Sequence, residues 1–259
     1  MANIETHAPG AFSWLELATT DQNGAKTFYT SLFGWSFEDT PIGPNDYYTM
    51  LRLRGRNAAA LYTMRDDEVA MGFPSHWNMY ITVENAEAAN ERAVALGGTL
   101  LYGPLDVAAH GRMSVLQDPT GAVFHTWQPK GHIGVGVAGE PGAFCWADLS
   151  TPDQASAAAF YSGLFGYELP PGDGGYLHLQ NGEAFIGGIQ PPAHRDPGTP
   201  PHWLVYIQVE DCEAMTAKAQ ALGARVYAGP MKMEKVGWMT VLADPQGAVF
   251  AMFQPTPER

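Results

Sequence analysis

Two acidic side chains lie in the middle of strand-like runs whose other residues are mostly apolar. Glu16 lies in FSWLELA, and Asp148 lies at the corresponding place in FCWADLS. A buried carboxylate without a partner is costly, so we expect both side chains to face a cleft or an ion pair. If burial shifts pKa values toward neutrality, such a carboxylate and a nearby histidine can act as a base and an acid in proton transfer.

One histidine distinguishes two otherwise similar segments. DPTGAVFHTWQP covers residues 118–129, and DPQGAVFAMFQP covers residues 244–255. His125 in the first copy is replaced by Ala251 in the second, so this segment folds without the imidazole. Histidine can donate, accept or shuttle a proton near neutral pH, and we therefore expect the polar chemistry in the copy that contains His125. By contrast, we expect His110 and His178 to be surface or loop residues.

The charge balance of the 259-residue chain argues against several classes of function. Lys and Arg number 14 against 27 Asp and Glu, which gives a net charge of −13. Contacts with phosphates need clustered basic residues, so we expect no nucleic-acid partner and no membrane partner. Cys145 and Cys212 lie in no CxxC pattern, which excludes a thiolate zinc site. Because no apolar run reaches transmembrane length, we expect a cytoplasmic, soluble monomer or homodimer.

The chain is a tandem duplication. PGAFSWLELATTDQ begins at Pro9, and PGAFCWADLSTPDQ begins at Pro141. Further on, HWNMYITVE at His76 matches HWLVYIQVE at His202. Self-similarity of this kind shows that one structural unit is used twice. The repeated His-Trp pair permits two readings, a site residue or a structural hydrogen bond at the start of a strand.

Each half divides again into two similar modules. Residues 12–18 alternate like a strand, Asp21 is typical of a helix N-cap, and Gly34 is typical of a helix end. Three shorter strands follow near 35–40, 46–54 and 57–64, and DPTG and DPQG are typical hairpin turns. The sequence thus predicts an α+β fold of four βαβββ modules in two domains, residues 9–129 and 142–255, with a linker at 130–141. The modules cover residues 10–64, 74–129, 142–190 and 200–255.

These modules resemble the vicinal oxygen chelate superfamily, which holds glyoxalase I, bleomycin-resistance proteins and extradiol dioxygenases. The resemblance rests on FYTSLFGW, VENAEAANERAVALGG and DPTGAVFHTWQP, and it extends from about Pro9 to Pro255. The chain is most similar to the two-domain glyoxalase-like proteins common in actinobacteria. The resemblance implies that two modules form a U-shaped cleft, with metal ligands on the first and last strands of each module. Whether modules pair within a half, or module 1 with 4 and module 2 with 3, stays open.

The resemblance also implies where metal ligands would lie, and most of those positions have lost ligand chemistry. Divalent ions in this family need inward-pointing His, Glu or Gln side chains. Among the corresponding positions only His125 is a strong ligand, and Asn78 is a weak one. The full set is Trp14, Ala60, Asn78 and His125, and then Trp146, Gly187, Leu204 and Ala251. We therefore expect no metal or other cofactor, with a divalent metal on the shifted ligands Glu16, His76 and His125 as the alternative.

Strand alternation predicts which side chains line the clefts. We expect Glu16 and His125 to be catalytic, and Phe12 to share the inward face of Trp14. The predicted ligand-binding residues are Trp14, His76, Asn78, Tyr80, Trp127, Trp146, Asp148, His202, Tyr206 and Phe253. Aromatic clefts with few polar groups favour binding an aromatic or carbonyl-containing metabolite, for sequestration or proton transfer. The alternatives are a metal-dependent enzyme of glyoxalase, lyase, isomerase or dioxygenase type, and an interaction protein without small-molecule chemistry.

Overall fold

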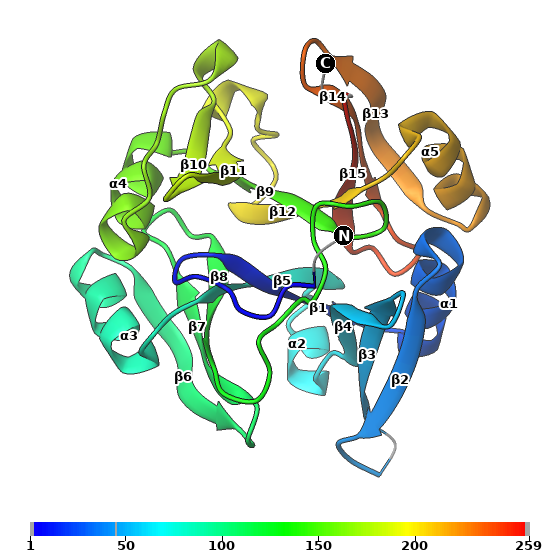
Figure 1. The fold of residues 1–259 in the computed structure, drawn as a ribbon, viewed down its shortest axis with the longest axis horizontal. Helices are drawn as coiled ribbons and strands as arrows, with labels where there is room; N and C mark the ends of the chain where they lie inside the picture. The colour runs from blue at the N-terminus through cyan, green and yellow to red at the C-terminus, as the bar shows by residue number, and fades with distance from the viewer. Residues whose placement is uncertain (1–2, 45, 257–259) are drawn as a thin grey trace.

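The first half of the chain forms a single mixed sheet. The computed structural model describes residues 3–44 and 46–256. The sheet has eight strands in the order β2-β3-β4-β1-β5-β8-β7-β6 (Figure 1). Its elements are β1 (Phe12–Thr19), α1 (Gln22–Phe33), β2 (Ser36–Pro41), β3 (Tyr47–Leu53), β4 (Arg56–Thr63), α2 (Asp66–Ala70), β5 (His76–Thr82), α3 (Ala86–Ala95), β6 (Thr99–Val107), β7 (Gly111–Gln117) and β8 (Val123–Pro129).

The second half repeats this arrangement with one strand fewer. Its seven-stranded sheet has the order β10-β11-β9-β12-β15-β14-β13. The elements are β9 (Phe144–Ser150), α4 (Gln154–Phe165), β10 (Leu177–Asn181), β11 (Ala184–Ile189), β12 (His202–Gln208), α5 (Cys212–Ala221), β13 (Arg225–Met233), β14 (Gly237–Ala243) and β15 (Val249–Pro255), with short 3₁₀ helices at Asp173–Gly175 and Pro192–His194. The predicted α+β fold of two tandem halves built from βαβββ-type modules is confirmed.

The predicted helix caps and hairpin turns are found at the expected residues. The Asp21 side chain accepts a hydrogen bond from the Gly24 N–H at 2.9 Å, and Gly34 ends α1 in the left-handed conformation. In the first hairpin turn, Asp118 Oδ1 accepts from the N–H groups of Thr120 and Ala122, at 2.7 and 3.1 Å. These bonds fix the turn between β7 and β8, and Asp244 does the same between β14 and β15.

The missing strand belongs to the third module. In place of a full strand, Glu168 and Pro171 make only isolated bridges, to Gln180 and Leu177. Pro170 and Pro171 have no N–H to donate to a strand ladder, which explains the interruption. The expectation of three strands after each helix is therefore wrong for this module.

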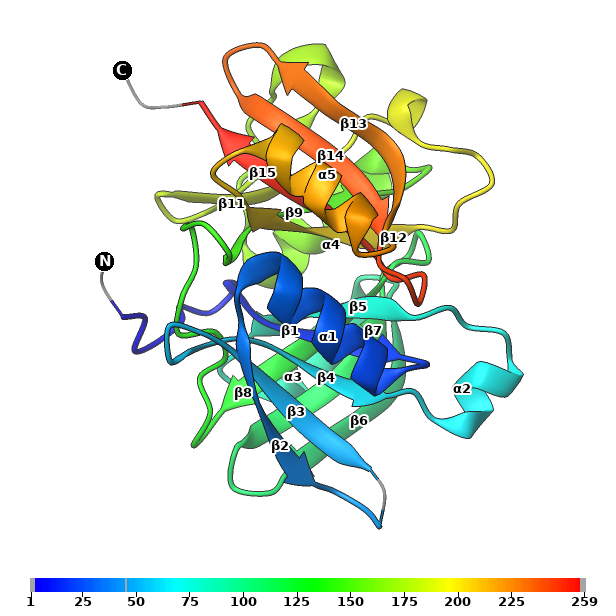
Figure 2. The ribbon, with the colours of Figure 1, turned by 90° about the vertical axis from the view of Figure 1, so that its right-hand side faces the viewer.

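Modules pair within each half, because no strand of one sheet belongs to the other. The two halves instead exchange helix contacts. Tyr29 on α1 donates a hydrogen bond to Asp244 at 2.9 Å, and Tyr161 on α4 donates one to Asp118 at 3.0 Å. Figure 2 shows α1 at the junction of the two halves. All four side chains are buried, and a single core cluster contains residues from both sheets.

A bulge in β1 corrects one predicted orientation. The register between β1 and β5 shifts between Phe12, which pairs with Ile81, and Trp14, which pairs with Tyr80. Phe12 consequently points away from Trp14 and packs in the core between the halves, 5.4 Å from the Trp203 ring. Among the described residues, no helix is long and apolar enough to span a membrane.

Candidate functional site

The side chains predicted to line the first cleft lie on the central strands β1, β5 and β8, and this set is called the first cleft below, with its counterpart in the other half called the second cleft. Residues paired across neighbouring strands project to the same face of a sheet. Trp14 pairs with Tyr80, Glu16 pairs with Asn78, and Tyr80 also pairs with His125. His76 and Trp127 lie two residues or a multiple of two from members of this set, and so share its face. The structure thus brings together Trp14, Glu16, His76, Asn78, Tyr80, His125 and Trp127.

Glu16 is held in this cleft by an indole and two phenols. Trp14 Nε1 and Tyr48 OH donate to Oε1 at 3.2 and 2.6 Å, while Tyr80 OH donates to Oε2 at 2.5 Å. Burial raises the pKa of Glu16 above its usual value, and the three hydrogen bonds oppose that rise. The carboxyl group is thereby shifted toward the range in which it can exchange protons near neutral pH.

The second cleft holds Asp148 in a closely similar way. Trp146 Nε1 and Tyr176 OH donate to Oδ1 at 3.0 and 2.5 Å. Tyr206 OH and Gln190 Nε2 donate to Oδ2 at 2.7 and 3.2 Å. Burial raises the pKa of Asp148, opposed by these four hydrogen bonds. The remaining predicted members of this cleft share the face, because Leu204 pairs with Asp148, Ala251 with Tyr206, and Phe253 with Gln208.

His125 is buried beside Tyr80, with 4.5 Å between the ring centroids. Its Nδ1 has no hydrogen-bond partner in the described part of the chain. Burial, with a smaller contribution from His76, lowers the pKa of His125 to about 3. The imidazole is therefore neutral at physiological pH. Any proton transfer by His125 at that pH starts from the neutral ring.

Three further predicted residues make specific contacts. Asn78 Nδ2 donates to Tyr62 OH at 3.1 Å. His76 and His202 each donate from Nδ1 to a proline carbonyl, that of Pro74 and Pro200 respectively, at 2.9 Å. Each repeated His-Trp pair thus begins its strand with a hydrogen bond from the histidine, as the structural alternative predicted. By strand alternation both histidines also lie on the cleft face.

The segment between the halves covers part of the first cleft. Val135 is buried and belongs to one apolar cluster with Trp14, Ala60, Tyr80 and Trp127. Trp127 Nε1 also donates to the backbone carbonyl of His132 at 2.8 Å. The corresponding cluster in the second cleft contains only residues of β9, β12, β14 and β15. Trp146 and Phe253 are half-buried there, whereas Trp14 and Trp127 are buried.

Several residues of the site were not predicted. Tyr48 lies on β3, Tyr62 on β4, and Tyr176 just before β10. Alternation in DYYTML was a usable signal for Tyr48, but Tyr176 follows a glycine-rich turn that has no strand pattern. His178 was expected at the surface or in a loop. It instead lies half-buried on β10, with its ring 6.3 Å from Trp146 and 5.0 Å from Tyr176.

The donor set does not fit the metal centre of the related fold. Glu16 accepts hydrogen bonds from Trp14, Tyr48 and Tyr80. Asn78 donates to Tyr62, and apart from His125 the other corresponding positions carry Trp, Leu, Ala or Gly. Within residues 3–44 and 46–256, no three His, Cys, Asp or Glu side chains are grouped to hold a metal ion. That includes the shifted set of Glu16, His76 and His125.

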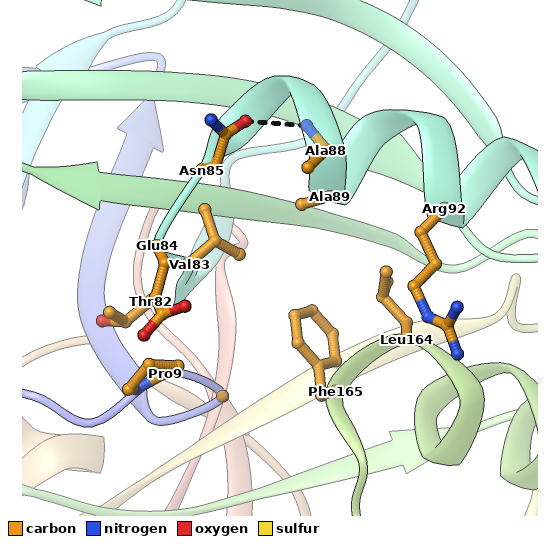
Figure 3. A pocket seen from close by; sticks show the side chains of 11 residues that line it. Pro9, Thr82, Val83, Glu84, Asn85, Ala88, Ala89, Arg92, Leu164 and Phe165 are labelled. Carbon is orange, nitrogen blue, oxygen red and sulfur yellow. Dashed lines mark hydrogen bonds between the residues drawn. The ribbon is translucent and has the colours of Figure 1, made fainter.

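Two surface hollows lie outside the clefts. One of about 260 Å³ lies between the start of α3 and the end of α4, lined by Asn85, Ala88, Ala89 and Phe165 among others (Figure 3). Another of about 390 Å³ lies beside α1 and β2. Neither contains a predicted site residue.

Comparison with known proteins identifies the family. The model of the glyoxalase-like domain matches residues 14–126 and again residues 146–253. The chain belongs to the glyoxalase-like domain family. The two matches of this glyoxalase-like chain fall one on each half, and the resemblance to the vicinal oxygen chelate superfamily is confirmed.

Relatives of this glyoxalase-like chain carry different names. It is 40% identical over 266 residues to the putative glyoxylase CFP32 of Mycobacterium tuberculosis, with 100% of both chains covered. It is 32% identical over 263 residues to the anthracycline biosynthesis protein DauV of a Streptomyces species, with 95% of this chain and 94% of that protein covered. A Mn(II)-bound glyoxalase from Novosphingobium aromaticivorans shares the fold, with a TM-score of 0.65, 15% identity, and coverage of 95% and 82%.

Proposed function

We propose that the protein binds an aromatic or carbonyl-containing metabolite in its strand-lined clefts without using a metal. Bound there, the metabolite is either sequestered or altered by proton transfer. The observation that carries this proposal is the repeated arrangement of a carboxyl group held by one indole and two phenols. Two copies of one unit keep this arrangement while neighbouring positions differ, which favours a role for it in function.

The chemistry of the cleft walls supports a planar ligand. Trp14, Tyr80 and Trp127 line the first cleft, and Trp146 and Phe253 line the second. Aromatic rings bind planar ligands through offset or edge-to-face contacts and bury a large apolar area. The few polar groups orient the ligand, as is usual in small-molecule sites.

Glu16 and Asp148 are the groups best suited to move a proton. Their raised pKa values favour exchange of a proton with a ligand C–H or O–H group near neutral pH. His125, being neutral, is suited to accept or donate one hydrogen bond beside Tyr80. In this proposal Glu16 is the candidate base of the first cleft, and Asp148 is the candidate base of the second.

The names of the relatives support both ligand types. A protein 32% identical along nearly the whole chain is named for anthracycline biosynthesis, which supports an aromatic ligand. The relative at 40% identity is named a putative glyoxylase, which points to a carbonyl substrate. Aromatic and carbonyl chemistry are therefore the two ligand types to test.

The test starts with the purified protein after chelation, checked by elemental analysis. A planar hydroxyanthraquinone is titrated by calorimetry and by quenching of tryptophan fluorescence, and methylglyoxal with glutathione is assayed for turnover with and without added Mn²⁺ or Ni²⁺. We expect the anthraquinone to bind the metal-free protein. Turnover of methylglyoxal only with metal, without binding of the aromatic probe, would overturn the proposal.

Proton transfer is separated from sequestration by exchange of the ligand's acidic C–H in deuterated buffer. We expect wild-type protein to accelerate this exchange and Glu16→Gln with Asp148→Asn to abolish the acceleration while binding remains. An unchanged exchange rate with wild-type protein would leave sequestration as the function.

A further inference from the structure

We infer that the second cleft is the ligand site, that it selects a planar aromatic carrying a free hydroxyl group, and that the first cleft is closed by the chain itself. The closing segment is residues 132–136, referred to below as the strap. This inference rests on the proposed function and specifies which of the two clefts carries it out.

The strap is bonded to both inner strands of the first module. The Val135 N–H donates to the Ser13 carbonyl of β1 at 2.7 Å, and the Gly136 N–H donates to the Asn57 carbonyl of β4 at 2.8 Å. The N-terminal segment also contacts the strap, because the Ile4 N–H donates to the Gly136 carbonyl at 3.2 Å. The strap is therefore an ordered part of the cleft wall.

Gly134 lets the strap approach β1 this closely. A Cβ at this position would lie 2.0 Å from the Ser13 carbonyl oxygen, and the residue has a φ of +112°. Only glycine combines that backbone conformation with such a close approach. Ser13 is also the residue at the bulge of β1, so the strap lies where the strand register shifts.

Val135 occupies the space over the aromatic floor of the first cleft. Its exposed fraction is 1%, and it packs with Trp14, Tyr80 and Trp127, whose exposed fractions are 3–5%. A flat ligand cannot stack on these rings while Val135 is in place. In the second cleft Trp146 and Phe253 are half-buried, and the His178 ring lies 6.3 Å from the Trp146 ring.

The hydrogen-bond directions around Asp148 define the polar preference of the second cleft. Tyr176 and Tyr206 each use their single O–H proton on the carboxylate. Trp146 Nε1 also donates to Tyr176 OH at 2.9 Å, which leaves one lone pair on that oxygen. The half-buried Tyr176 therefore offers a ligand an acceptor and no donor. A hydroxyl group on the ligand satisfies it, and a bare aromatic ring does not.

The experiment compares two probes on wild-type protein, a hydroxyanthraquinone with free phenol groups and the same ring system without hydroxyls. Calorimetry is expected to show one hydroxylated probe per chain, bound at least about ten-fold more tightly than the bare ring. Equal affinities for the two probes would overturn the hydroxyl preference. Two equal sites per chain would overturn the closure of the first cleft.

Variants then locate the bound probe. Trp146→Ala is expected to weaken binding at least about ten-fold, and Ala251→Phe, which fills the second cleft, to abolish it. Met113→Ala, which pairs with Trp127 and packs on the apolar cluster of the first cleft, is expected to change the affinity by less than about two-fold. The opposite pattern would place the ligand in the first cleft. If no aromatic probe binds wild-type protein at all, the proposed function fails and this inference fails with it.

Opening the strap is the complementary test. Gly134→Ala forces a Cβ against the Ser13 carbonyl. Gly139, outside the strap but in the linker of residues 130–141, also has a positive φ, and a Cβ added there has no atom within 4 Å. We expect a second bound probe per chain for Gly134→Ala and one for Gly139→Ala. One probe in both well-folded variants contradicts the strap's role.

If Gly134→Ala does not fold, hydrogen exchange of the wild-type protein with and without the probe tests the same point. Probe-induced protection of β5 and β8 would then refute the inference, and protection confined to β9, β12 and β15 would support it.

Discussion

Glu16 in the first cleft and Asp148 in the second are held by matching sets of donors, but the two clefts differ in everything around those carboxyl groups. The first has Asn78 and His125 where the second has Leu204 and Ala251. The first is covered by Val135, and its tryptophans are buried; the second leaves Trp146 and Phe253 half-buried. Asp148 accepts four hydrogen bonds, whereas Glu16 accepts three.

The comparison of the two clefts shows which residues of a duplicated site depend on one another. A buried carboxylate and its donors form one unit, because removing the carboxylate leaves buried donors unpaired and removing a donor leaves the carboxylate one hydrogen bond short. The floor and the cover of the cleft have no such mutual dependence. They have diverged, with Asn78, His125 and the buried Val135 in the first cleft and Leu204, Ala251 and the half-buried Trp146 in the second.

The largest effect expected from this comparison is on stability after loss of each carboxyl group. Asp148→Ala leaves the donors of Tyr176, Tyr206 and Gln190 without an acceptor, while Trp146 still donates to Tyr176, and we expect a loss of about 3 kcal/mol in the free energy of unfolding. Glu16→Ala leaves the donors of Tyr48 and Tyr80 without an acceptor, while Trp14 still donates to Tyr48. Because the half-buried Tyr48 is open to hydration, we expect a loss of about 1.5 kcal/mol.

Urea denaturation measures both losses, with the exposed Glu183→Ala as a control expected to change stability by less than about 0.5 kcal/mol. Equal losses in the two clefts would show that the difference in burial between the carboxyl groups has no energetic consequence.

A second difference concerns acid. The His125 pKa falls from 6.5 to about 3 on folding, so the unfolded state binds more protons between these values. The stability linked to His125 is thus fully present above about pH 6.5 and is lost as the pH falls toward 3. We expect His125→Ala to reduce the slope of stability against pH by up to about 1.4 kcal/mol per pH unit in this window.

Denaturation at about pH 7 and about pH 5 measures this slope, with the wild type as reference. His76 faces His125 and His132 lies above Trp14, so His76→Gln and His132→Gln serve as comparisons. The reciprocal Ala251→His is expected to introduce a similar slope through the second cleft. Identical slopes for wild type and His125→Ala would mean that His125 is not protected from protonation.

The smallest effect is expected for the exchange of Asn78 for its counterpart. Asn78→Leu removes one hydrogen bond to Tyr62, whose half-buried hydroxyl can be hydrated, so we expect a change within about 1 kcal/mol. The reverse change, Leu204→Asn, places an amide in an apolar cluster and should cost about 2 kcal/mol. Equal losses in the free energy of unfolding for Asn78→Leu and Leu204→Asn would show that the surroundings of these two positions differ less than their residue types indicate.

Much of the fold could be read from the sequence because its signals are local. Caps such as Asp21, turns such as DPTG, and the two-residue alternation around Glu16 each depend only on neighbouring residues. The same alternation predicted Glu16, Tyr80 and Asp148 on cleft faces, where the structure brings them beside their aromatic neighbours. Their functional roles stay predictions.

What sequence reasoning missed depends on long-range register. Phe12 was placed on the wrong face because a bulge follows it, and a bulge has no simple residue pattern. Tyr176 reaches Asp148 from an irregular segment after Pro171. Val135 lies in a glycine-rich stretch that reads as a linker, and only the folded chain shows that its side chain is buried over Trp14.

The hydrogen bonds from Tyr29 to Asp244 and from Tyr161 to Asp118 have a consequence for the ancestry of the chain. Each half places a tyrosine from its first helix on the hairpin-turn aspartate of the other half, so the contact is reciprocal. Reciprocal contacts of this kind define the two-fold interface of a homodimer. A half-length ancestor would have assembled as such a dimer, and fusion of its two copies would have made the interface internal. Only after fusion could the two copies acquire different residues, because a symmetric dimer must carry every substitution twice.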